Sequence, residues 1–470
     1  MSTSVGTACS KEMKEVRKLK DNIRIAEEKF MGDFARNGVQ LLSNKDPELF
    51  DLLTLEYRRQ VNSLSMVASS SIADPSVLAC EGTVLTNVTT EGYPGKRFHG
   101  GCKYVDKIEQ IAVERAKLAF NARYANVQPH SGSTANQIVM FNVLKPGDRV
   151  LALDLDSGGH LTHGSPASIT GKIFESYTYG LDKTGRINYD NVLDIAKRCK
   201  PHLIICGASA YPRFIDFERF RQIADEVGAL LLADISHIAG LVASGVHPSP
   251  IDHAHFTTTS TYKQLCGPRG GLIMCGRDWD MRLSGGSKTL AEIIQCGVFP
   301  RMQGTPMLSE IAAKARALAM VNTPQFRLLG KNIVNDARVF AEELKALGYD
   351  VLTGGTDNHM VLVDIGKRGL SGKIAESALE ESGIIVNKNK IPNDERGPMI
   401  TSGIRFGTNT LALRGMDATS MKVCATLVDK VLSNVEAIDD TNYKIDSCIV
   451  NDVQNEIKAL CMIYPIPHYL

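Results

Sequence analysis

The chain has 470 residues with 53 Lys and Arg against 52 Asp and Glu, so its formal net charge is +1. This balance gives no electrostatic argument for binding nucleic acid or an anionic membrane, and any bound anion must be held by a local site. Apolar residues make up 43% and charged residues 22%, which is ordinary for a globular protein and argues against disorder. The length predicts two or three folded units.

The cysteines and the first residues bear on the compartment. The 11 cysteines are scattered singly, a spacing that matches neither a zinc site nor a disulfide framework, so we expect no metal site and reduced thiols. The first 30 residues mix basic and acidic side chains, unlike a mitochondrial presequence, and lack the apolar run of a secretory signal. No apolar stretch is long enough to span a bilayer. These features predict a cytoplasmic protein with no membrane partner.

The N-terminal segment, from about residue 11 to residue 60, is charged and typical of helices. Its apolar residues recur at intervals that suit burial on one side, as at Ile23, Ile25, Phe30 and Phe34. We predict an N-terminal helical arm over residues 1–60. Such an arm suits packing or subunit contact better than catalysis.

Residues 62–101 are rich in Ser, Thr, Gly and Pro and end in EGYPGKRFHGG. A stretch with so much glycine does not suit a core. It is either a surface loop with incidental charges or a loop that places Glu91 and several donors, among them Lys96, Arg97 and His99, in a pocket. The composition leaves both interpretations open.

Helix-like and strand-like segments alternate from residue 103 to residue 321, a pattern that predicts a mostly parallel sheet covered by helices. Residues 103–120 are amphipathic, whereas residues 148–155, 202–209 and 229–234 are apolar and strand-like. A helix-prone stretch near residues 305–321 closes this block.

Polar residues follow several of these segments. The turn His130–Ser133 precedes an apolar helix, and it either seats a phosphate at the helix N-terminus or contains an ordinary serine N-cap. Asp234 and His237 follow an apolar run, and ligands bind at the carboxyl ends of strands in open α/β sheets. A carboxylate there can keep a ring nitrogen protonated, although Asp is also a common helix cap. His160 and His163 lie in a glycine-rich loop and by themselves indicate no function.

Lys263 lies between Thr-rich, strand-like residues and a turn with Gly and Pro, in DHAHFTTTSTYKQLCGPRGG. A lysine at the mouth of a strand can be a Schiff-base nucleophile, because partial desolvation lowers the pKa of its amine. A single lysine is more often a solvated surface residue, so the case for Lys263 depends on the rest of the chain.

A second alternating block begins near residue 322, with a helix expected at 334–347 and paired strands at 349–365. We place a domain boundary between residues 322 and 330. The predicted organisation is a helical arm at 1–60, a large domain at 61–321 and a smaller α/β C-terminal domain at 322–470.

Eight motifs occur along the chain in this order: EGYPGKRFHGG, NVQPHSGSTAN, GGHLTHGSP, ADISHIAGLV, TTTSTYKQLCGPRGG, GGTDNHM, VNKNKIPND and TSGIRFGT. In this order they resemble the serine hydroxymethyltransferase family, whose members are pyridoxal 5'-phosphate (PLP) enzymes of fold type I. The resemblance extends from the N-terminal arm to about Tyr464. It implies an aspartate aminotransferase-like α/β fold, PLP as cofactor and tetrahydrofolate as co-substrate.

The resemblance implies roles for single residues. Lys263 is similar to the lysine that forms a Schiff base with PLP, and Asp234 to the acid that pairs with the pyridinium nitrogen. Arg405 matches the arginine that takes the substrate carboxylate, with Ser69 as a second substrate residue. Glu91 resembles the catalytic acid/base supplied by the neighbouring subunit, which implies a homodimer or a dimer of dimers.

Further positions match the cofactor and folate groups of the family. The remaining implied PLP-binding residues are Ser131, Gly132, His160, Ser209, His237 and Gly304, and His160 and His237 also count among the catalytic residues. The implied folate-binding residues are Leu155, Gly159, His160, Leu161 and Asn389. The implied reaction interconverts serine and glycine: serine displaces Lys263, Glu91 promotes loss of the hydroxymethyl carbon, and tetrahydrofolate takes the one-carbon unit.

Departures from the family pattern cluster at the active site. Outside the glycine-rich loop they are Ser70, Ser71, Thr89, His99, Ser157 and Tyr262. Tyr262 precedes Lys263 where histidine is usual, and a phenol cannot carry the charge that an imidazole carries near neutral pH. The FPGGQGGP-type loop appears as FPRMQGTP, in which Arg301, Met302 and Thr305 cannot take positive φ without cost. Arg301 either adds a cation near the phosphate or blocks the loop.

Three functions stay open on this basis. The first is serine hydroxymethyltransferase or a close variant. The second keeps PLP and an amino-acid substrate but changes the reaction to folate-independent aldol cleavage, transaldol transfer or decarboxylation. The third is a paralogue with little catalysis that binds PLP or folate as a regulatory or scaffold subunit. Retention of Lys263 and Glu91 argues against a simple loss of catalytic function. Thr89 and the lost glycines around Gly304 argue against an active site identical to that of the family.

Overall fold

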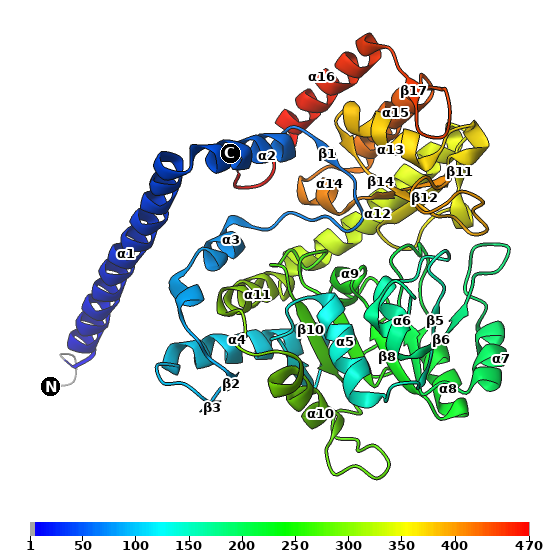
Figure 1. Cartoon of the computed structure of the whole chain (residues 1–470). Helices are drawn as coiled ribbons and strands as arrows, with labels where there is room; N and C mark the ends of the chain where they lie inside the picture. Colours follow the sequence, from blue (N-terminus) through cyan, green and yellow to red (C-terminus); the bar gives the residue numbers. More distant parts are fainter. Residues whose placement is uncertain (1–4, 470) are drawn as a thin grey trace. The chain divides into compact units, whose positions relative to one another are not determined.

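The computed structural model of the chain describes residues 5–469, with the side chains from Lys20 onward except that of Asn22. The chain divides into two compact units, residues 1–61 and 62–470. The first unit contains two helices, α1 (Val5–Lys45) and α2 (Pro47–Val61) (Figure 1).

The apolar residues of the first unit are exposed in the single chain. Phe30 is 70% exposed and Ile25 is 63% exposed, and no residue of the described part of this unit is buried. No residue in the described part of this unit covers that face, so the predicted burial on one side stays a prediction. An amphipathic pattern indicates a face that suits burial, but burial itself needs a partner surface.

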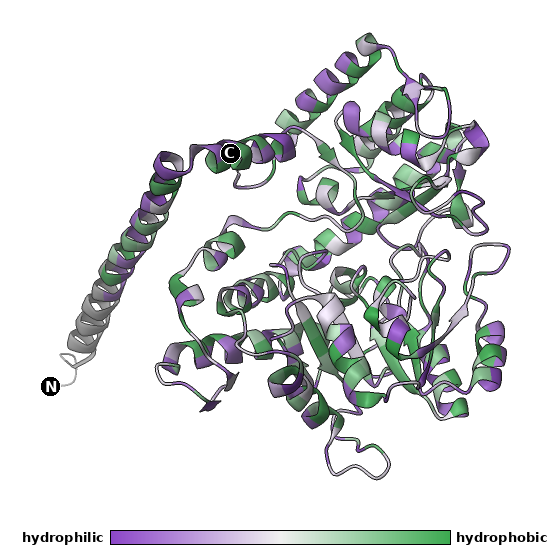
Figure 2. Cartoon of the chain, in the orientation of Figure 1, coloured by the Kyte–Doolittle hydropathy of each residue, from purple (hydrophilic) through white to green (hydrophobic). Residues whose placement is uncertain are grey.

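The second unit is built on a seven-stranded sheet in the order β4-β10-β9-β8-β7-β5-β6. All strand pairs in it are parallel except the two made by β10, so the predicted α/β sheet is confirmed as a mixed sheet. Strands buried on both faces are rich in apolar residues, and Figure 2 shows much of the central sheet in green. The Thr-rich strand that ends before Lys263 is an exception, because it is buried although four of its five residues carry hydroxyls. The strands are β4 (Tyr124–Asn126), β5 (Arg149–Leu153), β6 (Glu175–Tyr179), β7 (Leu203–Cys206), β8 (Leu230–Asp234), β9 (Phe256–Ser260) and β10 (Gly271–Cys275).

Helices cover this sheet, and several coincide with predicted segments. The amphipathic segment 103–120 is α4 (Lys103–Phe120), and the apolar helix after the Ser/Gly turn is α5 (Gly132–Val143). The other helices of this part are α3 (Pro75–Glu81), α6 (Ile169–Ile173), α7 (Tyr189–Cys199), α8 (Phe217–Val227), α9 (Ala239–Ala243), α10 (Leu290–Cys296) and α11 (Leu308–Val321).

A four-stranded sheet in the order β11-β12-β15-β14 follows. Its strands are β11 (Asp350–Val351), β12 (Met360–Asp364), β14 (Asn387–Asn389) and β15 (Gly403–Gly407), and its helices are α12 (Pro324–Ala346), α13 (Gly372–Glu381), α14 (Asn409–Leu413), α15 (Ala418–Leu432) and α16 (Ser447–Ile463). The helix expected from residue 334 begins ten residues earlier than predicted. Thr323 caps it by accepting a 3.3 Å hydrogen bond from the Phe326 N–H, and Pro324 takes the first helical position, which suits proline.

Residues 64–66 pack against the C-terminal part of the chain, although the predicted large domain includes them. The short strand β1 (Leu64–Ser65) pairs in parallel with β13 (Ile384–Ile385), and Leu64 and Met66 pack in the core beside α12. A pairing between segments so far apart leaves no local pattern. The predicted boundary near residue 322 stays a prediction. Among the described helices, none combines the length and the apolar character needed to cross a membrane.

Candidate active site

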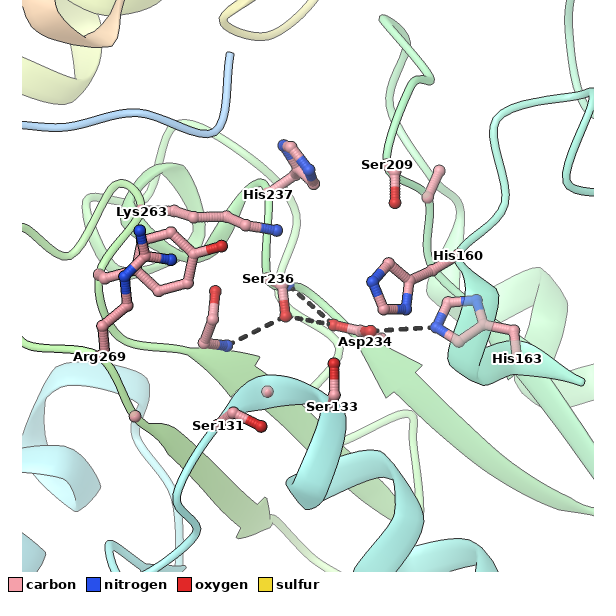
Figure 3. Close-up of a pocket in the computed structure, with 15 residues that line it drawn as sticks. Ser131, Ser133, His160, His163, Ser209, Asp234, Ser236, His237, Lys263 and Arg269 are labelled. Atoms are coloured by element: carbon pink, nitrogen blue, oxygen red, sulfur yellow. Dashed lines mark hydrogen bonds and ion pairs between the residues drawn. The ribbon is translucent and has the colours of Figure 1, made fainter. Parts of the chain in front are cut away.

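Six of the seven strands point their carboxyl ends at one edge of the sheet, and five of them lead into the candidate site. β5, β7, β8 and β9 are parallel neighbours, and β4 runs the same way because two antiparallel pairings separate it from β9. Ligand sites form at this edge in open α/β sheets. The residues that follow these strands line one cavity of 260 Å³ (Figure 3). They include Ser131, Gly132, Ser133, His160, His163, Ser209, Asp234, Ser236, His237, Ser260, Tyr262, Lys263 and Arg269.

Asp234, the last residue of β8, is a buried carboxylate with four hydrogen bonds around it. Ser236 donates its N–H and its hydroxyl to Oδ1 over 3.0 and 2.6 Å. Asn136 Nδ2 and His163 Nε2 lie 2.7 and 3.0 Å from Oδ2. Burial opposes ionisation of Asp234, but the hydrogen bonds from His163 and Ser236 outweigh burial and hold the pKa of this carboxyl well below its usual range. Asp234 therefore provides a fixed negative charge at the cavity.

Lys263 follows β9 by three residues, and its amine points into the cavity (Figure 3). Its Nζ lies 5.9 Å from the centroid of the Tyr262 ring and makes no hydrogen bond with any residue in the described part of the chain. Burial lowers the pKa of the amine to about 8, while Asp234 favours the charged form and Arg405 opposes it. About a tenth of the amine is then unprotonated at pH 7, so it is a usable nucleophile.

His160 and His237 both line the cavity, and burial keeps both rings neutral. Burial lowers the pKa of His160 to about 4 and that of His237 well below its usual range. The His237 ring stacks on His359, with centroids 5.9 Å apart and an angle of 16° between the planes. Side-chain ligand atoms of His160, His163 and Asp234 lie within 4.8 Å of one another, a grouping that can hold a metal ion. Four hydrogen bonds already engage the carboxylate, so we assign the grouping to holding Asp234.

The N-terminus of α5 faces the cavity and provides a seat for an anion. Ser131 is the N-cap, because its hydroxyl accepts a 3.0 Å hydrogen bond from the Thr134 N–H. A Cβ on Gly132 would lie 3.1 Å from Ser260 N, so a larger residue would crowd the seat. The Ser260 hydroxyl is buried and has no hydrogen-bond partner among the described residues. A phosphate at the free N–H groups of α5 would give it one.

Neither of the predicted substrate residues, Arg405 and Ser69, lines the cavity. Arg405 is in β15, and burial lowers the pKa of its guanidinium to about 10. Its Nη1 donates to the carbonyl of Ser209, a cavity residue, and its Nε donates to Asn387 over 3.1 Å. Ser69 is half-buried in the turn that precedes α3. The charge of Arg405 lies close enough to the cavity to lower the pKa of Lys263.

Glu91 and Gly304 lie next to each other and outside the cavity of their own chain. A Cβ on Gly304 would lie 3.5 Å from Oε1 of Glu91, and neither residue lines the cavity. Arg97 holds the backbone on both sides of Glu91, because its Nη1 donates to the carbonyls of Thr90 and Gly92. Glu91, which the resemblance assigns to a neighbouring subunit's site, therefore lies beside Gly304, one of the implied PLP-binding residues.

The predicted folate residues lie on two segments. The loop after β5 that carries His160 contains Leu155, Gly159 and Leu161, and both leucines are exposed. Asn389 ends β14 on the other segment. The next residue, Lys390, forms a 2.8 Å ion pair with Asp156 in the loop. This ion pair holds the two segments together.

Two departures from the family pattern are placed clearly. The Arg269 guanidinium lies 3.8 Å from the centroid of the Tyr262 ring, at the cavity wall. Arg301 is exposed and donates to Asn142 over 2.7 Å, at the end of α5 opposite to the cavity. Arg301 therefore adds no cation to the cavity of its own chain.

The sequence analysis gave no role to four residues around the cavity, Ser236, His163, Ser260 and Asn136. Three of them hydrogen-bond to Asp234, and the fourth has a buried hydroxyl without a partner among the described residues. Ser236 follows Asp234 by two residues, a spacing at which Asp commonly accepts backbone and hydroxyl hydrogens, so it could have been found. His163 is the second histidine of GGHLTHG, three residues after His160. Ser260 is the last residue of the strand that precedes Lys263. Asn136 has no such signal, because its partners come from distant segments.

The cavity thus combines a nucleophilic amine, a fixed carboxylate and an anion seat. This set suits a small ligand with an electrophilic carbon, a basic ring nitrogen and a phosphate. A family model described as serine hydroxymethyltransferase matches residues 42–428 of the chain. Members of that family are PLP-dependent transferases that use tetrahydrofolate, and PLP carries an aldehyde, a pyridine nitrogen and a phosphate.

Proposed function

The chain belongs to the serine hydroxymethyltransferase family, and from this premise we propose that it interconverts serine and glycine with transfer of a one-carbon unit to tetrahydrofolate. One observation carries the proposal: the free amine of Lys263 and the ionised Asp234 face the same cavity, with the N-terminus of α5 beside them. These three features match the aldehyde, the pyridine nitrogen and the phosphate of PLP.

The residues of the cavity divide the tasks of holding PLP. Lys263 supplies the amine for the covalent link, and Asp234 keeps a ring nitrogen protonated. Ser131, Gly132 and the Ser260 hydroxyl receive the phosphate. When bound, PLP supplies an electron sink for bonds at the α-carbon of an amino acid. The chain's own part is to fix the charge at Asp234 and to hold His160 neutral at the cavity.

The substrates approach from the surrounding segments. Arg405 binds the substrate carboxylate, which a guanidinium fork suits, with Ser69 and Ser209 nearby. Tetrahydrofolate lies between the loop that carries Leu155 and Leu161 and the strand end at Asn389. Glu91 moves the proton in the cavity of a second copy, so the working unit is a homodimer or a dimer of dimers in the cytoplasm. The second unit then consists of a large PLP-binding domain and a smaller domain from residue 322.

One observation favours a second function, an altered reaction on a 3-hydroxy amino acid without folate. Tyr262 lines the cavity with its ring beneath Arg269, where the family usually has histidine. The group next to the reactive lysine therefore differs in size and charge from the usual imidazole. Tyr262→His should raise the ratio of folate-dependent transfer to folate-independent cleavage if Tyr262 is responsible for such a change.

The experiment for the main proposal combines a spectrum with an assay. Purified protein with PLP should gain a visible absorption band, and serine with tetrahydrofolate should yield glycine. Cleavage of 3-hydroxy amino acids without any folate-dependent transfer would favour the second function. Absence of the band would contradict both functions.

A further inference from the structure

Asn136 lies behind the cavity wall and links two of its residues. The side chain is on α5, is fully buried and does not line the cavity. Its Nδ2 lies 2.7 Å from Asp234 Oδ2 and 2.9 Å from the Thr162 hydroxyl. Its Oδ1 accepts a 2.6 Å hydrogen bond from the Thr258 hydroxyl. Every polar atom of this amide is therefore engaged.

The partners fix the orientation of the amide. A flipped Asn136 would place its carbonyl oxygen against the carboxylate of Asp234, where two acceptors would face each other. Because Asp234 is ionised, it accepts only. The amide nitrogen must therefore face Asp234, and its second hydrogen points to Thr162.

The direction of the next hydrogen bond follows from this. The Thr162 hydroxyl accepts from Asn136 and has a single hydrogen to donate. The His160 Nδ1 lies 2.7 Å from that hydroxyl oxygen, and the Thr162 N–H also approaches Nδ1 at 3.3 Å. The His160 Nδ1 is thus an acceptor. A neutral imidazole with this acceptor carries its proton on Nε2.

We propose that Asn136 is a positioning residue that sets two protonation states at once: it stabilises ionised Asp234, and through Thr162 it keeps the proton of His160 on Nε2. The inference concerns the protein without cofactor. Its value for turnover rests on the proposed function, in which both residues would hold PLP.

An isosteric change tests the direction of the chain of hydrogen bonds. In Asn136→Asp the new carboxyl shares one proton with Asp234, because two adjacent carboxylates do not both ionise. The oxygen that replaces Nδ2 then accepts from Thr162. The Thr162 hydroxyl must turn away from His160, so Nδ1 donates to it and the proton moves to Nδ1.

The measurement is 15N NMR of the imidazole nitrogens in the apo protein, with His160 assigned by its loss in His160→Gln. In the wild type the Nε2–H form should be the major tautomer at pH 7, and in Asn136→Asp the Nδ1–H form should become the major one. Asn142→Asp is the matched control on the same helix, because Asn142 bonds to Ile138 and Arg301, away from the cavity. It should leave the His160 signals unchanged. Identical His160 signals in wild type and Asn136→Asp would overturn the proposal.

A second pair of variants keeps the test decisive if Asn136→Asp fails to fold. Thr162→Val removes the hydroxyl and leaves the backbone N–H of residue 162 as a donor to Nδ1, so the share of the Nδ1–H form should rise above its wild-type value. Thr162→Ser keeps the hydroxyl and should keep the wild-type signals. Unchanged tautomer populations in Thr162→Val would contradict the proposal that Thr162 connects Asn136 to His160. Since all these spectra use apo protein, a failure to bind PLP would refute the proposed function without touching this result.

Discussion

The Arg269 guanidinium lies 3.8 Å from the centroid of the Tyr262 ring, on the residue directly before Lys263. A cation on the face of an aromatic ring is attracted to it, so the ring keeps Arg269 at the cavity wall. There the charge of Arg269 helps to lower the pKa of Lys263. A residue that departs from the family pattern therefore influences the protonation of the proposed nucleophile.

Arg269→Gln should raise the pKa of Lys263 above its value of about 8, because a like charge is removed. Less of the amine is then unprotonated at pH 7, and attachment of PLP slows. The rate of attachment measured against pH should keep its shape and move its midpoint to higher pH. Arg277→Gln, a change at an exposed arginine outside the cavity, is the control. A midpoint equal to that of the wild type would contradict the assignment.

Asp234→Asn should lower the free energy of unfolding at pH 7 by about 1–3 kcal/mol, since buried donors lose a charged acceptor. The folded-state pKa of Asp234 is depressed, so its stabilisation is present above the unfolded pKa of about 3.9 and is lost as the pH falls below that value. Urea unfolding at several pH values should show the difference between wild type and variant shrinking on acidification. A difference that does not depend on pH would refute this account.

Lys314 is a buried lysine outside the cavity, and its Nζ donates to the carbonyls of Val127, Pro129 and Gly271 over 2.6, 3.1 and 3.2 Å. These carbonyls flank the turn that leads to Ser131. Lys314→Met should lower the free energy of unfolding by roughly 1–3 kcal/mol, because three buried acceptors lose their donor. Lys345→Met, at an exposed lysine on α12, serves as the control and should change stability little.

The pH dependence of the Lys314 effect has a definite sign. Burial lowers the pKa of Lys314 to about 7 from 10.5. Between these values the unfolded chain binds the proton more readily than the folded chain, so the wild type gains stability as the pH rises through this window. The stability difference between wild type and Lys314→Met should therefore grow from pH 7 to higher pH. A difference that falls would contradict the lowered pKa.

Glu91 and Lys263 can be tested as parts of one site built from two copies. Glu91→Gln and Lys263→Ala should each be inactive alone. Dimers mixed at random from the two variants should regain about a quarter of the wild-type activity, because only one site of each heterodimer holds both intact residues. No recovery in mixtures whose exchange is verified would place Glu91 and Lys263 in the same chain's site.

The parts of the site that follow strands could be predicted from sequence. Asp234 and Lys263 come directly after apolar or Thr-rich runs, and strand ends collect at one edge of a parallel sheet. Asn136 could not be predicted, because its bonds to Asp234 and Thr258 join segments 98 and 122 residues apart. The pairing of Leu64 with Ile384 could not be predicted for the same reason.

Other differences between prediction and structure arose where the sequence indicates what a side chain can do but not which surface it contacts. The spacing of Ile25 and Phe30 suits a buried face, yet both are exposed, because a pattern in the sequence does not supply the surface that would cover it. Arg301 stands in a loop expected near a phosphate, but its side chain donates to Asn142. A long arginine side chain reaches several surfaces, and only the fold decides among them.

The central claim is that Lys263 is the amine that binds PLP, and reduction followed by peptide mapping tests it most directly. Protein mixed with PLP is treated with borohydride, digested and mapped by mass spectrometry. Lys263 should carry the reduced cofactor, and Lys263→Ala should carry none at any position. Lys314 is an internal comparison, because burial lowers its pKa further, to about 7, but it does not line the cavity. Label on Lys314 or another lysine, or no label on Lys263, would contradict the claim.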